Sequence, residues 1–367
     1  MRTIILFFLV VVSLQSCNNE TPTKPEPIKP LLSVLDTLYV GGNFEYIDSL
    51  QVNNIAMWDG KKWHKVGKGL PGSGVNCMTV FRNELYVGGF IDSAGGKPVN
   101  NIAKWDGKNW FPLGEGIDGK VTNLTVYKDE LYVSGWFRNA GGKVTNNIAR
   151  WNGSQWLAVG DGFNDEVYTL AVYNNCLYAG GWFNKSGITS PSKIAKWDGT
   201  KWYEVVDISS DQGNSWVENL YVYSDKLLIM GNFNAINGKP VNKIALWNDT
   251  TCMFFGNIQQ NKQNYYFLNA TEFNGVLFLS GSFTAIDSIS TRYYAMWNGN
   301  KWMQTNFTTD LPASKLFTTD NALYIGGIFQ FVNNKYIGGI FKWDGNTISK
   351  LGNGVKGGIY AIGVYTK

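Results

Sequence analysis

The chain has 367 residues, of which 44% are hydrophobic and 16% are charged, and its formal net charge is +4. This small, dispersed positive charge argues against a nucleic-acid-binding protein, because such proteins cluster Lys and Arg on one face. The 42 Gly, 15 Trp, 19 Tyr and 21 Phe favour many short strands and tight turns over long helices. We therefore expect an all-β protein.

The beginning of the chain predicts an export signal. Arg2 supplies a basic head, an apolar run extends from Ile4 to Val12, and the small residue Ser16 stands directly before Cys17. The apolar run is too short to span a membrane, which takes about 20 such residues. Residues 1–16 are therefore expected to be a signal peptide.

The sequence Leu14-Gln15-Ser16-Cys17 resembles the lipobox of bacterial lipoproteins. The resemblance implies that cleavage leaves Cys17 as a lipid-modified N-terminus, which attaches the protein to a membrane through the lipid alone. Cleavage by an ordinary signal peptidase is the alternative, because Gln15 stands where a small or aliphatic residue is usual. Residues 17–30 are polar and Pro-rich and predict a tether. We expect a location in the bacterial cell envelope, periplasmic or at the surface, and Asn18 favours the outer membrane.

The rest of the chain repeats a Leu-Tyr-Val-Gly-Gly phrase, or a degenerate form of it, every 46 to 50 residues. The copies begin at Leu38, Leu85, Leu131, Leu177, Leu227, Leu277 and Leu323. A fixed period of this size indicates a repeat architecture. Residues 31–367 are therefore predicted to form one domain of seven repeats.

Each copy predicts four short strands. In the third copy we expect strands over residues 121–127, 131–137 and 146–151, and a fourth from about Trp156. The Asn152-Gly153 pair before the fourth strand suits the positive φ angles of a tight hairpin. A four-stranded antiparallel sheet with two apolar faces must stack on neighbours, and a period of about 40 to 50 residues is typical of propeller blades. We predict a seven-bladed β-propeller.

The two ends of the domain predict how the ring closes. Residues 359–365 match the pattern of a first strand, but no second strand follows them. The first copy has a second strand from Leu38 and only a short first-strand candidate, residues 31–34. We expect N- and C-terminal strands to pair and close the ring, and residues 31–34 compete with residues 359–365 for the same place.

The double Gly that closes the second strand, followed by a Trp in the third strand, resembles the kelch-type propeller repeat. In the second copy these residues are Gly88, Gly89 and Trp105. The resemblance covers the chain from about residue 31 and implies a propeller. Asn-Asn-Ile-Ala replaces the Tyr spacing that usually precedes this Trp in kelch repeats.

Few residues form patterns that suggest catalysis or metal binding. The single histidine, His64, has no recurring nucleophile or metal-ligand partner nearby, and we interpret it as a surface strand residue. Cys77, Cys176 and Cys252 lack the CxxC-type spacing of metal sites. No calcium loop or phosphate-binding Gly loop is present. We predict no catalytic residue, cofactor or metal, although a carbohydrate-active enzyme that uses two loop carboxylates stays an alternative.

Two aromatic columns recur across the copies and predict the core between blades. The columns are Phe44, Phe137, Phe183, Phe233, Phe283 and Phe329, and Trp58, Trp105, Trp151, Trp197, Trp247, Trp297 and Trp343. Because positions shared by all copies build the scaffold, departures from the repeat are the better candidates for function.

The departures predict a ligand site at the mouth of the central channel. The residue before the Phe column becomes Phe90, Trp136 and Trp182 in three neighbouring copies. In the two 50-residue copies, Trp216 and Tyr266 end the enlarged connections over residues 207–216 and 256–266. Aromatic rings exposed at a shallow mouth suit a glycan or a protein partner. The alternative is that they only fill space between blades.

These observations favour a lipid-anchored, extracytoplasmic binding or scaffold protein that presents the propeller's loop face to a glycan or a protein. Two alternatives stay open. One is a glycoside hydrolase or lyase that uses loop carboxylates, and the other is a structural subunit of a cell-envelope assembly.

Overall fold

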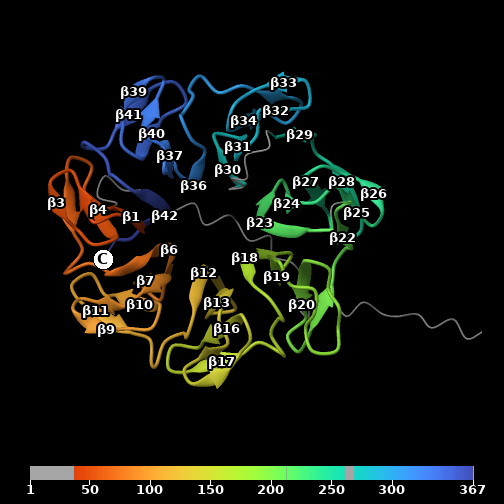
Figure 1. The fold of residues 1–367 in the computed structure, drawn as a ribbon, viewed down its shortest axis with the longest axis horizontal. Coiled ribbons are helices and arrows are strands. Elements are labelled where there is room, and N and C mark those ends of the chain that lie inside the picture. The colour runs from red at the N-terminus through yellow and green to blue at the C-terminus, as the bar shows by residue number, and fades with distance from the viewer. Residues whose placement is uncertain (1–36, 212, 261–267, 367) are drawn as a thin grey trace, which may run out of the picture.

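The computed structural model describes residues 37–211, 213–260 and 268–366, in which all regular secondary structure is β-strand. The described strands form seven four-stranded antiparallel sheets. Figure 1 shows these sheets around a common centre in chain order. The all-β prediction is therefore confirmed. The predicted signal peptide and tether, Cys17 and residues 31–34 lie outside the described residues.

In every four-stranded sheet one strand lies innermost, near the common centre, and the other three follow outward (Figure 1). From the inside outward, the sheet that contains both ends of the described chain consists of β42 (Gly358–Val364), β1 (Leu38–Asn43), β4 (Ile55–Trp58) and β5 (Trp63–Lys65). The second sheet, again from the inside outward, consists of β6 (Gly72–Phe81), β7 (Glu84–Ile91), β10 (Ile102–Trp105) and β11 (Trp110–Pro112). The third consists of β12 (Lys120–Tyr127), β13 (Glu130–Trp136), β16 (Ile148–Trp151) and β17 (Trp156–Ala158). The fourth consists of β18 (Val167–Tyr173), β19 (Cys176–Gly181), β20 (Ile194–Trp197) and β21 (Trp202–Glu204). The last three are β23 (Trp216–Tyr223), β24 (Lys226–Asn232), β27 (Ile244–Trp247) and β28 (Cys252–Phe254); β30 (Asn269–Phe273), β31 (Val276–Ser280), β34 (Tyr294–Trp297) and β35 (Trp302–Met303); and β36 (Ala313–Thr319), β37 (Ala322–Gly327), β40 (Ile340–Trp343) and β41 (Ile348–Lys350).

The order of the strands defines two faces of the molecule. Connections from the second to the third strand and from the fourth strand to the next sheet lie on one face, which we call the loop face. The tight turns from first to second and from third to fourth strand lie on the opposite face, the turn face. Gly153, which the sequence places in a tight hairpin, lies in the turn between the third and fourth strands and has a φ of 102°. This φ is accessible to Gly and costly for a residue with a Cβ.

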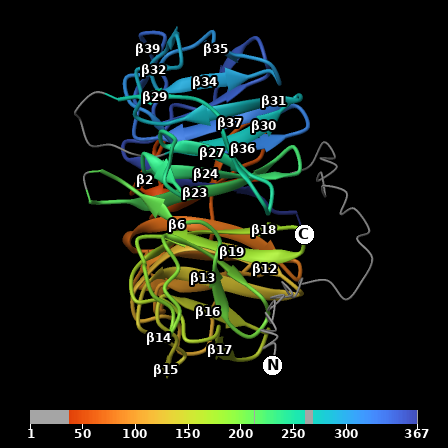
Figure 2. The ribbon, with the colours of Figure 1, turned by 90° about the vertical axis from the view of Figure 1, so that its right-hand side faces the viewer.

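Six of the second-to-third-strand connections contain small hairpins, in addition to the four strands predicted for each copy. The hairpins are β2–β3 (Tyr46–Ile47, Leu50–Gln51), β8–β9 (Ser93–Ala94, Lys97–Pro98), β14–β15 (Asn139–Ala140, Lys143–Val144), β25–β26 (Ala235–Ile236, Lys239–Pro240), β32–β33 (Ala285–Ile286, Ile289–Ser290) and β38–β39 (Phe331–Val332, Lys335–Tyr336). In the two longest copies, β22 (Ile208–Ser209) and β29 (Ile258–Gln259) add a third strand to the hairpin. Figure 2 shows several of these hairpins along one side of the molecule, the loop face.

The predicted Phe column is buried: Phe183, Phe283 and Phe329 are 0% exposed. In the Trp column, Trp105, Trp151, Trp197, Trp247 and Trp343 are buried, whereas Trp58 and Trp297 are half-buried. Buried side chains form seven clusters, each between two neighbouring sheets. The core therefore lies between sheets, as propeller packing requires, because each sheet buries both of its faces against neighbours.

A second Trp column, on the fourth strands, also links neighbouring sheets. The indole Nε1 of Trp156 donates a hydrogen bond of 2.8 Å to the carbonyl of Leu113 in the preceding sheet, and that of Trp202 donates one of 3.1 Å to Val159. Trp63, Trp110 and Trp302 make the equivalent bond. The recurring indole therefore satisfies its own buried donor and a connection carbonyl of the neighbouring sheet.

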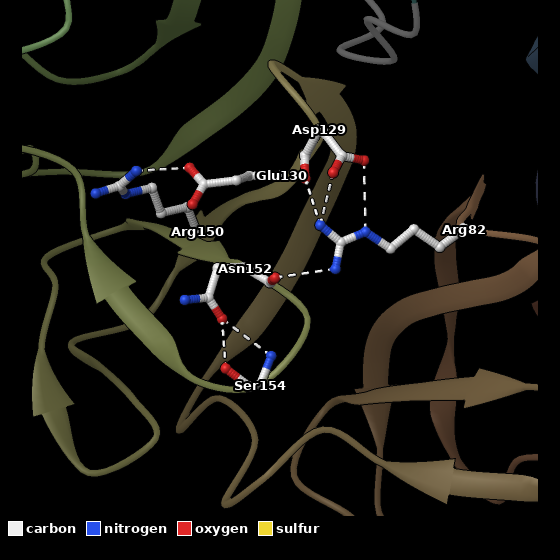
Figure 3. A network of polar contacts seen from close by, with 6 residues as sticks. All are labelled: Arg82, Asp129, Glu130, Arg150, Asn152 and Ser154. Carbon is white, nitrogen blue, oxygen red and sulfur yellow. Dashed lines mark hydrogen bonds and ion pairs between the residues drawn. The ribbon is translucent and has the colours of Figure 1, made fainter.

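On the turn face, Arg82 joins two sheets (Figure 3). Its guanidinium donates to the Asp129 carboxylate at 2.7 Å and to the carbonyl of Asn152 at 3.1 Å. The hydrogen bond from Arg82 lowers the pKa of Asp129. Both side chains are exposed, and exposed ion pairs contribute little to stability, so this contact mainly orients the turns.

Candidate functional site

The loop face contains a hollow of about 1100 Å³, which we call the loop-face hollow. Its walls come from three sheets: Phe90 from β7, residues 136–138 and 144–147 around the β14–β15 hairpin, and the connections over residues 118–120, 160–164 and 185–188. It therefore opens where the loops of neighbouring sheets meet.

Two of the five predicted ligand residues lie in this hollow. Phe90 is 41% exposed and lies opposite Gly74 in the strand pair β6–β7. Trp136 is 62% exposed and ends β13, opposite Lys120. A ligand that covers the exposed ring of Trp136 would bury apolar area that the described chain leaves open to water.

The next two predicted residues form a separate pair. The rings of Trp182 and Trp216 stack at a centroid distance of 4.8 Å and an angle of 13°, and both side chains are half-buried. The indole Nε1 of Trp216 also donates a 2.9 Å hydrogen bond to Glu218. These residues pack on each other rather than lining the hollow. Tyr266, the fifth predicted residue, lies outside the described residues.

Trp216 adjoins a cluster of charged side chains around Glu218. Burial raises the pKa of the Glu218 carboxyl, while the hydrogen bond from Trp216 and the charge of Lys120 lower it, and Glu166 raises it. Lys120 itself pairs with Glu166 at 3.0 Å. Each carboxylate of this cluster has a partner within it: Glu166 pairs with Lys120, and Glu218 accepts a hydrogen bond from the indole of Trp216.

Asn147, directly before the third strand β16, lines the hollow. The Asn147 side chain accepts from the Phe137 amide at 2.9 Å and donates to the Phe163 carbonyl at 2.9 Å. Asn147 has a φ of 67°, a conformation that Asn tolerates better than most residues. In later copies Lys193, Lys243, Tyr293 and Gly339 occupy this position, also at positive φ. The change from Asn to Lys and Tyr is visible in the repeat, but the sequence-based prediction missed it.

The carboxylate of Asp118 in the hollow belongs to the scaffold. It accepts hydrogen bonds from the amides of Arg138 and Asn139, at 2.9 and 2.8 Å, and from the Asn139 side chain at 2.6 Å. Asn164 and Asp310 cap the equivalent connections. Since its acceptor sites hold the β14 hairpin, Asp118 is a poor candidate for acid–base chemistry.

The single histidine, His64, lies on the outer strand β5. Its Nε2 is 2.7 Å from the carboxylate of Asp59, and it does not line the hollow. Across the described chain no group of three or more His, Cys, Asp or Glu side chains is arranged to hold a metal ion. The described residues also contain no helix that is long and apolar enough to cross a membrane.

One family model matches part of the chain and supports the propeller fold. The model of the Rax2 C-terminal β-propeller domain matches residues 33–171, less than half of the chain. No curated protein matches. Among solved structures, the WD40 β-propeller domain of Doa1 aligns with 15% identity and a TM-score of 0.48, over 80% of this chain and 87% of that one.

Two further solved structures align over a similar share of the chain. YCF48 bound to D1 peptide aligns with 14% identity and a TM-score of 0.44, over 80% of this chain and 85% of that one. The computationally designed Ika8 protein aligns with 13% identity and a TM-score of 0.46, over 78% and 89%. Taken with its stacked four-stranded sheets, the family-model match identifies this chain as a β-propeller protein.

Proposed function

We propose that the chain is a lipid-anchored, extracytoplasmic binding protein, in which a closed seven-bladed propeller presents the loop-face hollow to a glycan or a protein. The observation that carries the binding role is Trp136, a large aromatic side chain that is 62% exposed and lines the hollow together with Phe90. Most other Trp side chains of the described chain are buried or half-buried. An exposed Trp of this kind is typical of binding sites.

Closure of the ring by its terminal strands is part of this proposal. The pairing of β42 with β1 supports it, because Gly41 and Ala361 are partners although they lie at opposite ends of the chain. The indole of Trp63 donates to the Leu351 carbonyl, and β42 contacts both β36 and β6. We further propose that the seven sheets are seven blades of a kelch-like repeat, supported by the double Gly and the Trp that recur in the sequence.

The anchor is proposed from the sequence. Residues 1–16 are the signal peptide, Cys17 bears the lipid, residues 17–30 form the tether and residues 31–367 form the propeller. The cell-envelope location follows from the lipobox-like motif, with the outer membrane favoured.

Replacing Cys17 with Ser is expected to release the protein from the membrane fraction, because the side chain that would accept the lipid is removed. The measurement is the share of the protein that sediments with membranes of the expressing bacterium. Cys252→Ser is the matched control and is expected to stay in the membrane fraction. Retention of Cys17→Ser at the wild-type level would contradict the anchor.

Replacing Trp136 or Phe90 with Ala is expected to weaken ligand binding about tenfold or more, because each removes an exposed ring from the hollow. Ligands are first found on a glycan array and in an envelope extract, and affinities are then measured on the purified variants. Tyr46→Ala is the control, since Tyr46 is a similarly exposed aromatic residue, at 48%, outside the hollow. Unchanged binding by both hollow variants, with unchanged thermal melting, would reject the site.

A further inference from the structure

The rim of the loop-face hollow is more apolar than a sugar-stacking site requires. Besides Phe90 and Trp136, Val144 on β15 is 57% exposed and Ile188 is 100% exposed, and all four line the hollow. Single exposed apolar residues are ordinary on protein surfaces, but a group around one hollow marks an interaction site. Val144 and Ile188 are aliphatic and have no flat ring face for a sugar. Their removal from water is most favourable when they pack against apolar side chains.

Ile188 is itself a departure from the repeat. It occupies the tip of the second-to-third-strand connection, where the other copies have Ser49, Gly96, Gly142, Gly238, Ser288 and Asn334. In this turn Gly187 adopts the left-handed conformation, with a φ of 55°. A fully exposed Ile contributes nothing to packing in the described chain, so the scaffold does not explain it.

The charges of the hollow favour an acidic partner. Arg138 and Lys185 line it and are exposed, and neither takes part in an ion pair within the described ranges. The other lining cation, Lys120, is paired with Glu166, and Asp118 is occupied by its three donors. Asp161 is the remaining exposed lining carboxylate. Two cations are thus available against one carboxylate.

The size of the hollow fits a chain segment. A volume of about 1100 Å³ is slightly above the range of about 300 to 1,000 Å³ for small-molecule pockets. Loops of neighbouring sheets form its walls, which leaves a wide opening suited to several residues of an extended peptide.

We propose that the loop-face hollow binds a protein segment that combines large apolar side chains with carboxylates. The apolar side chains contact Trp136, Val144 and Ile188, and the carboxylates pair with Arg138 and Lys185, since Arg binds carboxylates through two parallel hydrogen bonds. This inference rests on the proposed function, because it names the partner of the same hollow.

The test begins with a phage-displayed library of random 12-residue peptides, selected on the purified full-length chain in detergent. We expect a consensus that combines Asp or Glu with large apolar residues. The enriched peptide is then synthesised, and its affinity is measured by fluorescence anisotropy. Ile188→Ser is expected to weaken it about tenfold, whereas Phe254→Ser, a change at another exposed apolar side chain (59%) outside the hollow, leaves it unchanged. Because six other copies have a small or polar residue at this tip, Ile188→Ser is expected to melt as wild type does.

The charge component is tested by the double variant Arg138→Gln/Lys185→Gln. We expect this variant to bind the acidic peptide about tenfold more weakly at low salt. Its affinity should also depend less on salt, because ions screen the attraction between opposite charges in water. The same peptide with Gln and Asn in place of its acidic residues should bind wild type and the double variant equally.

Several outcomes would overturn the inference. A basic consensus, no consensus, or wild-type affinity in Ile188→Ser would each do so, and so would self-association of the chain that Ile188→Ser abolishes. Glycan binding that Trp136→Ala removes but Ile188→Ser retains would refute the peptide partner and leave the proposed binding role intact. Binding that is unaffected by any of the hollow variants would refute both.

Discussion

Replacing Trp202 with Ala is expected to lower the free energy of unfolding by about 3 to 5 kcal/mol, the usual loss for a large aromatic residue removed from a core. Trp202 is 1% exposed, and its ring centroid lies 5.1 Å from that of Trp197 and 4.8 Å from that of Phe163. The change also leaves the buried carbonyl of Val159 without its indole donor. The measurement is chemical denaturation followed by tryptophan fluorescence and circular dichroism.

Two further variants separate the contributions of Trp202. Trp202→Phe keeps most of the apolar area but removes the hydrogen bond, and is expected to cost about 1 to 3 kcal/mol. Tyr203→Ala is the neighbouring control, because Tyr203 is 42% exposed on the same strand, and is expected to change stability little. A loss below about 1 kcal/mol in Trp202→Ala would show that the indole does not link the sheets.

The second large effect is expected for Gly42→Ala, which tests the pairing of β1 with β42. A Cβ at Gly42 would overlap the carbonyl oxygen of Gly358 and approach the backbone of Ile359. Because backbone atoms cannot move aside as a flexible side chain can, the strands must separate, at a cost of about 1 to 3 kcal/mol or more. The expected result is a lower denaturation midpoint and faster hydrogen exchange in β42.

Gly363→Ala is the matched control in the same strand pair. A Cβ there would meet only the flexible side chain of Met78, at 3.1 and 3.3 Å, so the change is expected to be almost neutral. Equal stability of the Gly42 and Gly363 variants, with unchanged exchange in β42, would be incompatible with terminal strands that hold the ring together.

Much of the fold could be predicted because it depends on short-range pattern. The strand predicted over residues 121–127 is β12 (Lys120–Tyr127), and the one over 131–137 is β13 (Glu130–Trp136). The hairpin at Asn152-Gly153 was recognisable because the need for a positive φ leaves a local trace in the residue type. The small hairpins such as β14–β15 were missed, because two-residue strands are too short for a period to be seen.

The candidate site was predicted only in part. Phe90 and Trp136 were selected as departures from a column, and the structure brings both to one hollow. The same reasoning selected Trp182 and Trp216, which stack on each other instead. The sequence-based prediction missed Arg138 and Ile188. Ile188 could have been found, because the other copies have Gly, Ser or Asn at the same position of the connection.

By itself, the sequence determined the β class, the number and period of the repeats and the aromatic columns, because each of these recurs at a fixed local spacing. Only the tertiary structure decided that Trp156 and Trp202 bond to the preceding sheet, in which register β42 pairs with β1, and that Trp136 faces a hollow while Trp182 meets another ring. These contacts join residues tens to hundreds of positions apart. They depend on how neighbouring sheets pack and on where each side chain points, which no local pattern specifies.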